Sequence, residues 1–579
     1  MNNETRTCQN CKQNFTIESE DFAFYEKIKV PPPTFCPRCS HQRRFAWRNT
    51  LALYRRPDPI TGKSMISIYH PDTKMNIVDQ SYWWGDQWDP FDYGFEYDFT
   101  KPFFKQWSNL RDTVPFQSLS NSKAVNSEYC NVAEESYDCY LVSAAWKNER
   151  VMYADSITNI KDSLDLYVVF RSEFCYEDIY CADSNRLFYS EKTTSSTDSY
   201  FLYDCKGCVN CFMCSNLRNK SYCFENVQYS KEEYFQKIGQ YNLGSFQTIK
   251  KLKKQFEMLK INAIHKYATM TNCHNTTGND ISGVIDSKSV FDVSGNVKDT
   301  KYLFWAAENV FSCYYCNAIA MLENSFESYD TGAGGVSCNF CNVVYYSNNV
   351  EYSFNCYSCH DVFGCIGLRN KSYCILNRQY TKEEYFELVS KIKKHMVDMP
   401  YVDAKGNIYR YGEFFPIELS PFAYNETIAN DFYPLSETEA KQSFFKWRAK
   451  EAHQYHPTVK STELPDTISE VKDSIVDEII ECEHAGICGH RCASAYKILA
   501  NELTFYRRLN IPLPRLCYGC RHSHRFERRT PLELWNRSCM CDNDSHGHGK
   551  KCSNTFETAY APDRPEKIFC EQCYQKEVL

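Results

Sequence analysis

The sequence predicts a mixed, mainly β fold in which two treble-clef-like zinc modules at the termini flank a repeated, parallel β-solenoid with capping helices. Three observations indicate this class. A cysteine-containing segment near the N-terminus recurs near the C-terminus, the middle of the chain contains a second repeat, and that middle is built from short aromatic triplets separated by polar turns. Together they predict metal-stabilised ends around a stacked centre.

The composition excludes several classes of protein. With 579 residues, 43% hydrophobic and 16% aromatic, the chain is long and apolar enough for about three to five domains with well-packed cores. Its net charge of -7 argues against a generally basic nucleic-acid coat. Met1 is followed by no apolar leader, no 18-residue apolar run occurs, and most of the 32 cysteines have metal-type spacings. We therefore expect a cytoplasmic protein with reduced thiols and no membrane segment.

The first segment, residues 1–75, predicts a zinc module of the treble-clef type. Two CxxC pairs supply the four thiolates that a tetrahedral zinc site needs: Cys8, Cys11, Cys36 and Cys39. Nearly alternating apolar residues between the pairs predict a hairpin: Phe15, Ile17, Phe22 and Phe24. The basic stretch 41–48 predicts a helix after the second pair. A tryptophan-rich connector, 76–119, follows, and we expect it to pack against the rest of the chain.

The centre of the chain predicts two stacks, at 120–229 and 268–379. They share the heptapeptide Leu-Arg-Asn-Lys-Ser-Tyr-Cys, which begins at Leu217 in the first and, 151 residues later, at Leu368 in the second. In the first stack, short aromatic triplets recur before it at intervals of roughly 11 to 14 residues, with Asn, Asp and Ser between them. This spacing favours a parallel β-solenoid, with a β-sandwich as the alternative.

Helices are expected after each stack, at 230–267 and 380–398. Both begin with a capping box, because Ser230 and Thr381 are each followed three residues later by glutamate. The first helical segment should cap the first stack and separate it from the second. The second should follow the end of the second stack directly.

Four cysteines in the first stack are spaced three residues apart: Cys205, Cys208, Cys211 and Cys214. This series is compatible with a zinc or iron-sulfur site. The internal repeat places Val362 opposite Cys211, however, which favours small residues stacked in the solenoid interior.

An extended connector, 399–480, carries aromatic anchors such as Phe432 and leads to the C-terminal module, 481–579. A shift of 481 residues superposes the cysteines of this module on those of the first. The expected ligands of its first site are Cys488, Cys492, Cys517 and Cys520, with Cys482 as a spare. Those of its second site are Cys541, Cys552, Cys570 and Cys573, with Cys539 as a spare. About two to four structural zinc ions per chain follow from these sets.

Basic residues follow the second CxxC pair in both modules. The candidate phosphate-binding residues are Arg43, Arg44, Arg48, Arg521, Arg525, Arg528 and Arg529. A solvated helix face that pairs with nearby acidic residues explains the same pattern. Both interpretations stay open at this level.

Several motifs resemble those of an uncharacterised multi-zinc-finger protein family of candidate-phylum bacteria. They are the two heptapeptides, the segment Tyr411–Asn425, Tyr560-Ala-Pro-Asp-Arg-Pro565 and Cys570-Glu-Gln-Cys-Tyr574. The resemblance spans nearly the whole chain. It implies zinc binding and no established activity.

The sequence favours binding over catalysis. It contains no phosphate-binding loop, no HExxH zinc-protease motif and no GxSxG nucleophile elbow, and all-thiolate metal sites are typical of structural zinc. We therefore predict a zinc-binding scaffold or binding protein that contacts RNA or a ribonucleoprotein through its basic modules, with a protein partner equally compatible. The alternative is a hydrolase or lyase that acts on a polymer through an acidic groove on the solenoid. The oligomeric state stays open.

Overall fold

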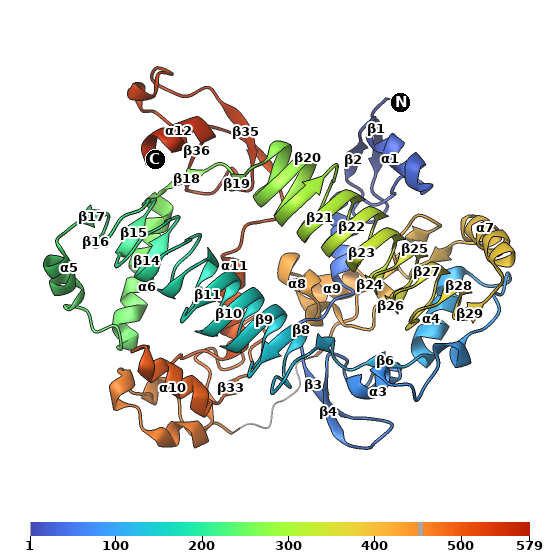
Figure 1. Ribbon diagram of the computed structural model, residues 1–579, viewed down its shortest axis with the longest axis horizontal. Coiled ribbons are helices and arrows are strands. Elements are labelled where there is room, and N and C mark those ends of the chain that lie inside the picture. The colour runs from blue at the N-terminus through green and yellow to red at the C-terminus, as the bar shows by residue number, and fades with distance from the viewer. Residues whose placement is uncertain (1, 450–455, 579) are drawn as a thin grey trace.

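Two stacks of parallel strands form the centre of the molecule (Figure 1), and a computed structural model describes residues 2–449 and 456–578. The first stack is an eleven-stranded sheet of β7 (Asn121–Ser122), β8 (Asn131–Tyr137), β9 (Ser143–Met152), β10 (Asp155–Leu164), β11 (Tyr167–Glu173), β12 (Ile179–Ala182), β13 (Asn185–Phe188), β14 (Thr197–Tyr203), β15 (Phe212–Ser215), β16 (Cys223–Phe224) and β17 (Val227–Gln228). The second comprises β19 (Met270–Thr271), β20 (His274–Lys298), β21 (Phe304–Tyr314), β22 (Asn317–Phe326), β23 (Tyr329–Asn339), β24 (Asn342–Tyr345), β25 (Asn348–Glu351), β26 (Phe354–Tyr357), β27 (His360–Phe363), β28 (Ser372–Ile375) and β29 (Arg378–Gln379).

Each coil of the first stack is twelve residues long, since Asp155 pairs with Tyr167 and Tyr167 with Ile179, all in parallel register. Coils of the second stack take eleven to thirteen residues. Within a coil every third residue has a positive φ, as at Ser156 (59°) and Asn159 (58°). The residue after most of these, such as Ile157 and Ile160, points inward and is buried. The predicted parallel β-solenoid is therefore confirmed, and the β-sandwich is not formed.

Both stacks end in an antiparallel pair, β16 with β17 and β28 with β29. The predicted capping helices follow: α5 (Lys231–Ile238), α6 (Phe246–Asn262) and α7 (Lys382–Asp398). Ser230 and Thr381 form the expected capping boxes at α5 and α7.

The N-terminal segment differs from the predicted hairpin in one respect. β1 (Glu4–Thr7) pairs with β2 (Asn14–Ile17) around the first cysteine knuckle, so the hairpin encloses Cys8 and Cys11 and does not follow them. Phe22 and Phe24 lie in helix α1 (Asp21–Ile28). Tertiary packing explains the difference, because Phe24 stacks on Tyr314 of the second solenoid with ring centroids 3.9 Å apart. The helix predicted after the second knuckle is confirmed as α2 (Pro37–Phe45).

The remaining elements are short and cover the stacks. They are α3 (Gln80–Trp84), α4 (Phe103–Thr113), α8 (Ile428–Phe432), α9 (Glu437–Gln442), α10 (Ala500–Arg508), α11 (Tyr518–Glu527), α12 (Glu571–Val578), and the strand pairs β3 (Tyr54–Pro57) with β4 (Ser64–Ser67), β5 (Ile77–Val78) with β6 (Phe116–Gln117), β18 (Ile264–Lys266) with β36 (Lys567–Phe569), β30 (Tyr401–Val402) with β31 (Ile408–Tyr409), β32 (Ile480–Glu481) with β33 (Ala495–Tyr496), and β34 (Trp535–Ser538) with β35 (Thr555–Thr558). Figure 1 shows α8 and α11 between the two stacks. Among the described residues, no helix has the length and apolar character needed to cross a membrane.

Candidate metal centres and the cleft between the solenoids

The N-terminal metal centre contains the four predicted cysteines. The ligand atoms of Cys8, Cys11, Cys36 and Cys39 all lie within 4.8 Å of one another. The sulfur atoms of Cys11 and Cys36 are 3.7 Å apart. Tetrahedral thiolates at about 2.3 Å from a zinc ion lie about 3.8 Å apart, so the group has the size of a zinc site.

The first C-terminal centre brings together Cys482, Cys492, Cys517 and Cys520, all buried. The sequence assigned Cys488 to this set and Cys482 as a spare, and the structure places Cys482 in the all-cysteine group. The β32–β33 hairpin explains this position: the amide of Cys482 donates to the carbonyl of Ser494 at 2.8 Å, which brings Cys482 next to the segment that contains Cys492.

The second C-terminal centre consists of Cys539, Cys552, Cys570 and Cys573, all buried. Cys539, which the sequence gave as a spare, belongs to this group because it extends β34 and its amide donates to the carbonyl of Asn554 at 2.8 Å. Burial raises the pKa of Cys570, but hydrogen bonds from the Asn554 side chain and the Cys573 amide outweigh it and lower that pKa to about 7. These contacts favour a thiolate, the form that binds a metal.

The two predicted ligands that lie outside the all-cysteine groups belong to further groups, which contain histidine. Cys488 groups with His484, His490 and Cys520, and Cys541 groups with His546, His548 and Cys573. Each of these groups could hold a metal ion, as could the three all-cysteine groups.

The cysteine series of the first stack has a different environment. Cys205, Cys208, Cys211 and Cys214 are buried in the solenoid interior among leucine, valine and isoleucine side chains. The thiol of Cys205 donates to the carbonyls of Tyr203 (3.5 Å) and Cys214 (3.7 Å), and the others make the same pair of contacts. Burial raises the pKa of Cys214 to about 12. These features fit interior packing residues.

The arginines of the N-terminal module contact the second solenoid. Arg43 and Arg44 lie on α2 and both pair with the buried carboxylate of Glu327, at 2.9 and 3.2 Å. Arg48 pairs with Asp330 at 2.6 Å. Although burial disfavours the charged guanidinium, the charges of Glu327 and Glu413 raise the pKa of Arg43.

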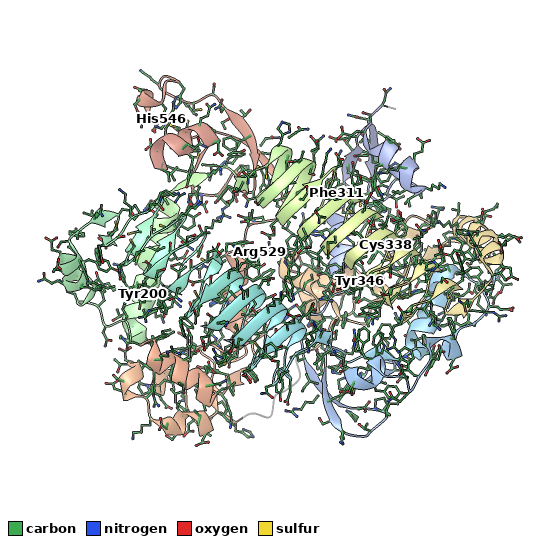
Figure 2. The ribbon with its side chains drawn as sticks, viewed as in Figure 1. Tyr200, Phe311, Cys338, Tyr346, Arg529 and His546 are labelled. Atoms are coloured by element: carbon green, nitrogen blue, oxygen red, sulfur yellow. The ribbon has the colours of Figure 1, made fainter. Side chains whose placement is uncertain are left out.

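The arginines of the C-terminal module contact the first solenoid in the same manner. Arg521 and Arg525 lie on α11 and both pair with the fully buried Asp165, at 2.9 and 2.7 Å. Arg528 pairs with Glu191, and the guanidinium of Arg529 lies 4.1 Å from the ring centre of Phe432. Arg529 lies between the two stacks (Figure 2).

The sequence left two interpretations of these seven arginines open, and the structure places six of them in ion pairs with carboxylates of the stacks. Five are buried, namely Arg43, Arg44, Arg48, Arg521 and Arg525. Their charges are matched by carboxylates of the stacks, so these helices dock the modules on the solenoids. The docking is crossed: the N-terminal module lies on the second solenoid and the C-terminal module on the first.

A cleft of about 980 Å³ lies where the two solenoids approach each other. Lys192 of the first stack is 3.9 Å from Asp280 of the second, and the Tyr180 hydroxyl is 3.4 Å from Asp292. Eleven aromatic residues line it: Tyr167, Phe170, Tyr180, Tyr203, Phe304, Trp305, Tyr329, Phe432, Phe526, Tyr560 and Tyr574. Seven acidic and five basic side chains also line it.

The pKa values of two aspartates of the cleft are raised. Burial, with the neighbouring charge of Asp280, raises the pKa of Asp292 well above its usual value. Burial, with the neighbouring charge of Asp431, raises the pKa of Asp155 to about 6, although Ser156 donates a hydrogen bond to this carboxyl. A large cavity with a few buried titratable groups is the usual form of a ligand site.

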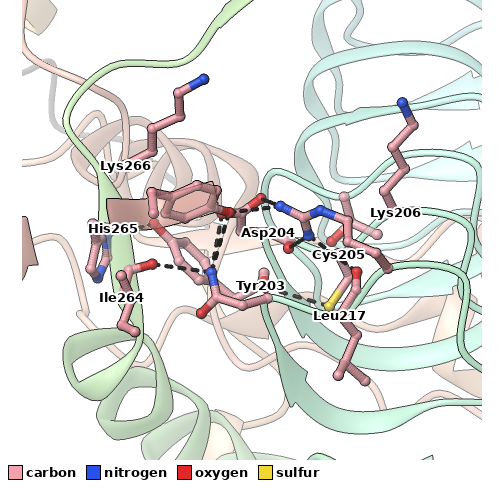
Figure 3. Close-up of polar contacts among 12 residues, drawn as sticks. Tyr203, Asp204, Cys205, Lys206, Leu217, Ile264, His265 and Lys266 are labelled. Carbon is pink, nitrogen blue, oxygen red and sulfur yellow. Dashed lines mark hydrogen bonds and ion pairs between the residues drawn. The ribbon is translucent and has the colours of Figure 1, made fainter. Parts of the chain in front are cut away.

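Residues of the C-terminal module line one side of this cleft. Figure 3 shows polar contacts around Tyr203, Asp204 and His265. The Tyr574 hydroxyl of α12 donates to Asp204 of the first stack and accepts from Arg218 at 2.6 Å. His265 contacts the hydroxyls of Tyr203 (2.8 Å) and Tyr560 (3.1 Å), and burial lowers its pKa to about 4. Neutral His265 and the hydrogen-bonded set of Tyr574, Asp204 and Arg218 thus connect the C-terminal module to this side of the cleft.

Sequence reasoning did not find the cleft, because its residues come from both stacks and from the C-terminal module. One signal was available. Asp280 and Asp292 are twelve residues apart, and the amide of Ser289 donates to the Thr277 hydroxyl across the same twelve-residue offset, which places the two aspartates at equivalent positions of neighbouring coils.

Comparisons with known proteins assign no family. No protein-family model and no curated protein matches the chain. Among solved structures, a Desulfovibrio desulfuricans G20 protein described as a "putative acetyltransferase" aligns over 50% of this chain and 86% of its own, at 11% identity and a TM-score of 0.10. A similarity that weak carries no argument about fold or function.

Proposed function

We propose that this protein is a zinc-stabilised binding protein whose ligand occupies the cleft between the two solenoids. The observation that carries the proposal is the cavity of about 980 Å³ at the junction of both stacks and the C-terminal module. The metal centres stabilise modules that are too small for an adequate core of their own. Docked through α2 and α11, these modules hold the two stacks in place.

The lining supports a hydroxyl-rich ligand of low charge, such as an oligosaccharide. Eleven aromatic rings offer flat apolar faces, and carboxyl and tyrosine groups offer hydrogen bonds. RNA or a ribonucleoprotein, the partner expected from the basic residues, has weaker support, because the arginines are occupied and acidic groups outnumber basic ones in the cleft.

Binding of defined probes to the full-length protein tests the proposal. We expect neutral oligosaccharides of six or more units to bind and poly-uridine RNA not to bind, by titration calorimetry. Trp305→Ala should weaken binding by about tenfold or more, because it removes a stacking face in the cleft. Trp146→Ala is the matched control, since Trp146 is exposed on the first stack outside the cleft. RNA binding without saccharide binding, or equal effects of the two substitutions, would contradict the proposal.

A second candidate function is acid–base cleavage of a polymer in the same cleft. Asp280 and Asp292 lie on neighbouring coils, whose backbones are about 4.8 Å apart. The raised pKa of Asp292 supports a general acid, and Asp280, beside Lys192, is placed to act as the second carboxylate. Retaining glycosidases use two carboxyl groups about 5 Å apart.

Asp292→Asn separates the two functions. If the cleft is catalytic, this variant should bind an oligosaccharide normally and release no new reducing ends, whereas the wild-type protein releases them. Asp198→Asn serves as the control, since Asp198 pairs with Arg186 at 2.6 Å and does not line the cleft. Absence of cleavage by the wild-type protein would leave binding as the function.

A further inference from the structure

Each C-terminal metal centre offers seven ligand residues, three more than one tetrahedral ion needs. In the first they are Cys482, His484, Cys488, His490, Cys492, Cys517 and Cys520. In the second they are Cys539, Cys541, His546, His548, Cys552, Cys570 and Cys573. Seven is the number of ligands that two four-coordinate ions require when they share one.

One cysteine belongs to both groups in each centre. The sulfur of Cys520 lies 3.9 Å from that of Cys482, 3.7 Å from that of Cys488 and 3.3 Å from Nδ1 of His484. It therefore faces the all-cysteine group and the histidine group together. Cys573 has the same position in the second centre.

The histidines are oriented for metal binding by their outer nitrogens. Nε2 of His490 is 3.1 Å from Glu527, and its Nδ1 is buried without a hydrogen-bond partner. Nδ1 of His548 is 3.1 Å from the carbonyl of Gly549, and its Nε2 is likewise buried without a partner. A ligand histidine typically donates its other ring N–H to a carboxylate or carbonyl, and this contact fixes the tautomer.

His546 shows the same arrangement. Its Nε2 lies 3.4 Å from the carboxylate of Glu577, and its Nδ1 lies 3.2 Å from the sulfur of Cys541. His546 lies in the C-terminal module at the outer edge of the molecule (Figure 2). Both histidine groups contain partly exposed residues, whereas both all-cysteine groups are buried.

The N-terminal centre provides the contrast. Its first knuckle contains only Gln9 and Asn10 between the two cysteines. Cys39, which aligns with Cys520, accepts a hydrogen bond from Nδ2 of Asn10 at 3.3 Å. An amide thus occupies the side of this sulfur where the C-terminal centre places a histidine and a cysteine.

We propose that each C-terminal centre holds two zinc ions bridged by one thiolate, Cys520 in the first and Cys573 in the second. The inner ion of each pair binds four thiolates, and the outer ion binds two histidines and two thiolates, a mixture that suits zinc. Five thiolates against two dications leave a net charge of -1 per centre, smaller than the -2 of an isolated four-thiolate site. With the N-terminal site, the chain carries five zinc ions.

Metal analysis of the purified full-length protein tests the count. We expect five zinc ions per chain in the wild-type protein, four in His484→Ala/His490→Ala, and three when His546→Ala/His548→Ala is added. His360→Ala on the second solenoid is the control and should keep five, since His360 is exposed and far from all three centres in sequence. Three zinc ions in the wild-type protein, unchanged by the histidine substitutions, would overturn the proposal.

A second measurement on the wild-type chain is independent of any variant folding. After exchange with ¹¹³Cd, two ions that share a thiolate show scalar coupling in the cadmium NMR spectrum, and isolated ions do not. We expect two coupled pairs and one uncoupled signal. Signals without coupling would overturn the bridged arrangement.

Discussion

The two terminal modules dock through equivalent helices, α2 and α11, but differ in the first cysteine knuckle. In the first module, α2 places Arg43 and Arg44 on a single buried carboxylate, Glu327. In the last, α11 places Arg521 and Arg525 on Asp165. The first knuckle has two residues between its cysteines, whereas Cys482 and Cys492 enclose nine, including three further ligand residues.

This difference indicates that two parts of each module have separate roles: the helix that follows the second cysteine pair, and the first knuckle. The helix sets where the module docks, and it is similar in both copies. The knuckle sets how many metal ions the module can hold, and it has diverged. The rings of Phe45 and Phe526, which align in the two copies, contact Phe432 at 4.8 and 5.0 Å, so the modules meet through the connector.

The largest expected effect comes from removing one ligand in each copy. Structural zinc contributes about 10–16 kcal/mol to the folding of small modules. Cys36→Ser should release one zinc ion and expose β1 to α2 to amide exchange. Cys517→Ser should release at least one ion and expose α10 and α11. Cys139→Ser, whose thiol contacts a solenoid carbonyl, is the control and should leave the zinc content unchanged.

The second largest expected effect comes from removing the charge of a carboxylate that docks a module, Asp165 or Glu327. Asp165→Asn should destabilise docking by about 3–5 kcal/mol, because it leaves the guanidinium of Arg525 buried beside a neutral amide. Glu327→Gln should cost less, since Arg43 keeps its second partner, Glu413, at 2.9 Å. Urea unfolding midpoints measure both effects. Equal shifts would show that the two docking sites do not differ in this way.

Asp155 is a buried carboxyl without an arginine partner. Its substitution by asparagine should stabilise the protein, whereas the substitutions of Asp165 and Glu327 should destabilise it. The pKa of Asp155 is raised to about 6 from 3.8, so the folded state favours its protonated form. The associated stability is present below pH 3.8 and is lost as the pH rises through 6. Asp155→Asn should therefore stabilise the protein by about 3 kcal/mol at pH 8 and by little at pH 4, measured by urea unfolding. A stabilisation independent of pH would contradict this assignment.

The smallest expected effect concerns the contact between the modules. Phe432→Ala should destabilise the protein by about 2 kcal/mol, because Phe432 is only half-buried and its removal leaves Phe45 and Phe526 without their shared neighbour. Phe432→Leu should recover about half of the loss. Thermal melting measures both, and Phe444→Ala, an exposed ring, serves as the control.

Much of the fold could be predicted because repeats carry strong periodic signals. The twelve-residue coil follows from triplets with Asn and Asp at left-handed positions, where these residues are tolerated better than most. Cys205 and Cys208 have the spacing of Cys517 and Cys520, and spacing alone could not separate them. The aligned Val362 could, because a valine fills an interior position but binds no metal.

The membership of the all-cysteine groups could not be predicted from cysteine spacing alone. The sequence assigned Cys488 and Cys541 to these groups, whereas Cys482 and Cys539 complete them in the structure. A β-hairpin sets the ligand pair instead, through the register of its strands. The arginines were placed on a solvated or phosphate-binding face because their carboxylate partners lie far away in the chain, and no local pattern reveals such a partner.

Crossed docking has a consequence for synthesis on the ribosome. Asp165 and Arg525 are 360 residues apart, so at about 5–20 residues per second the first solenoid exists for about 20 to 70 seconds before its partner helix emerges. During that interval the carboxylate of Asp165 and the surface that α11 later covers face water and other chains. A chain truncated before α11 therefore keeps this surface uncovered, and we expect chaperones and proteases to act on it.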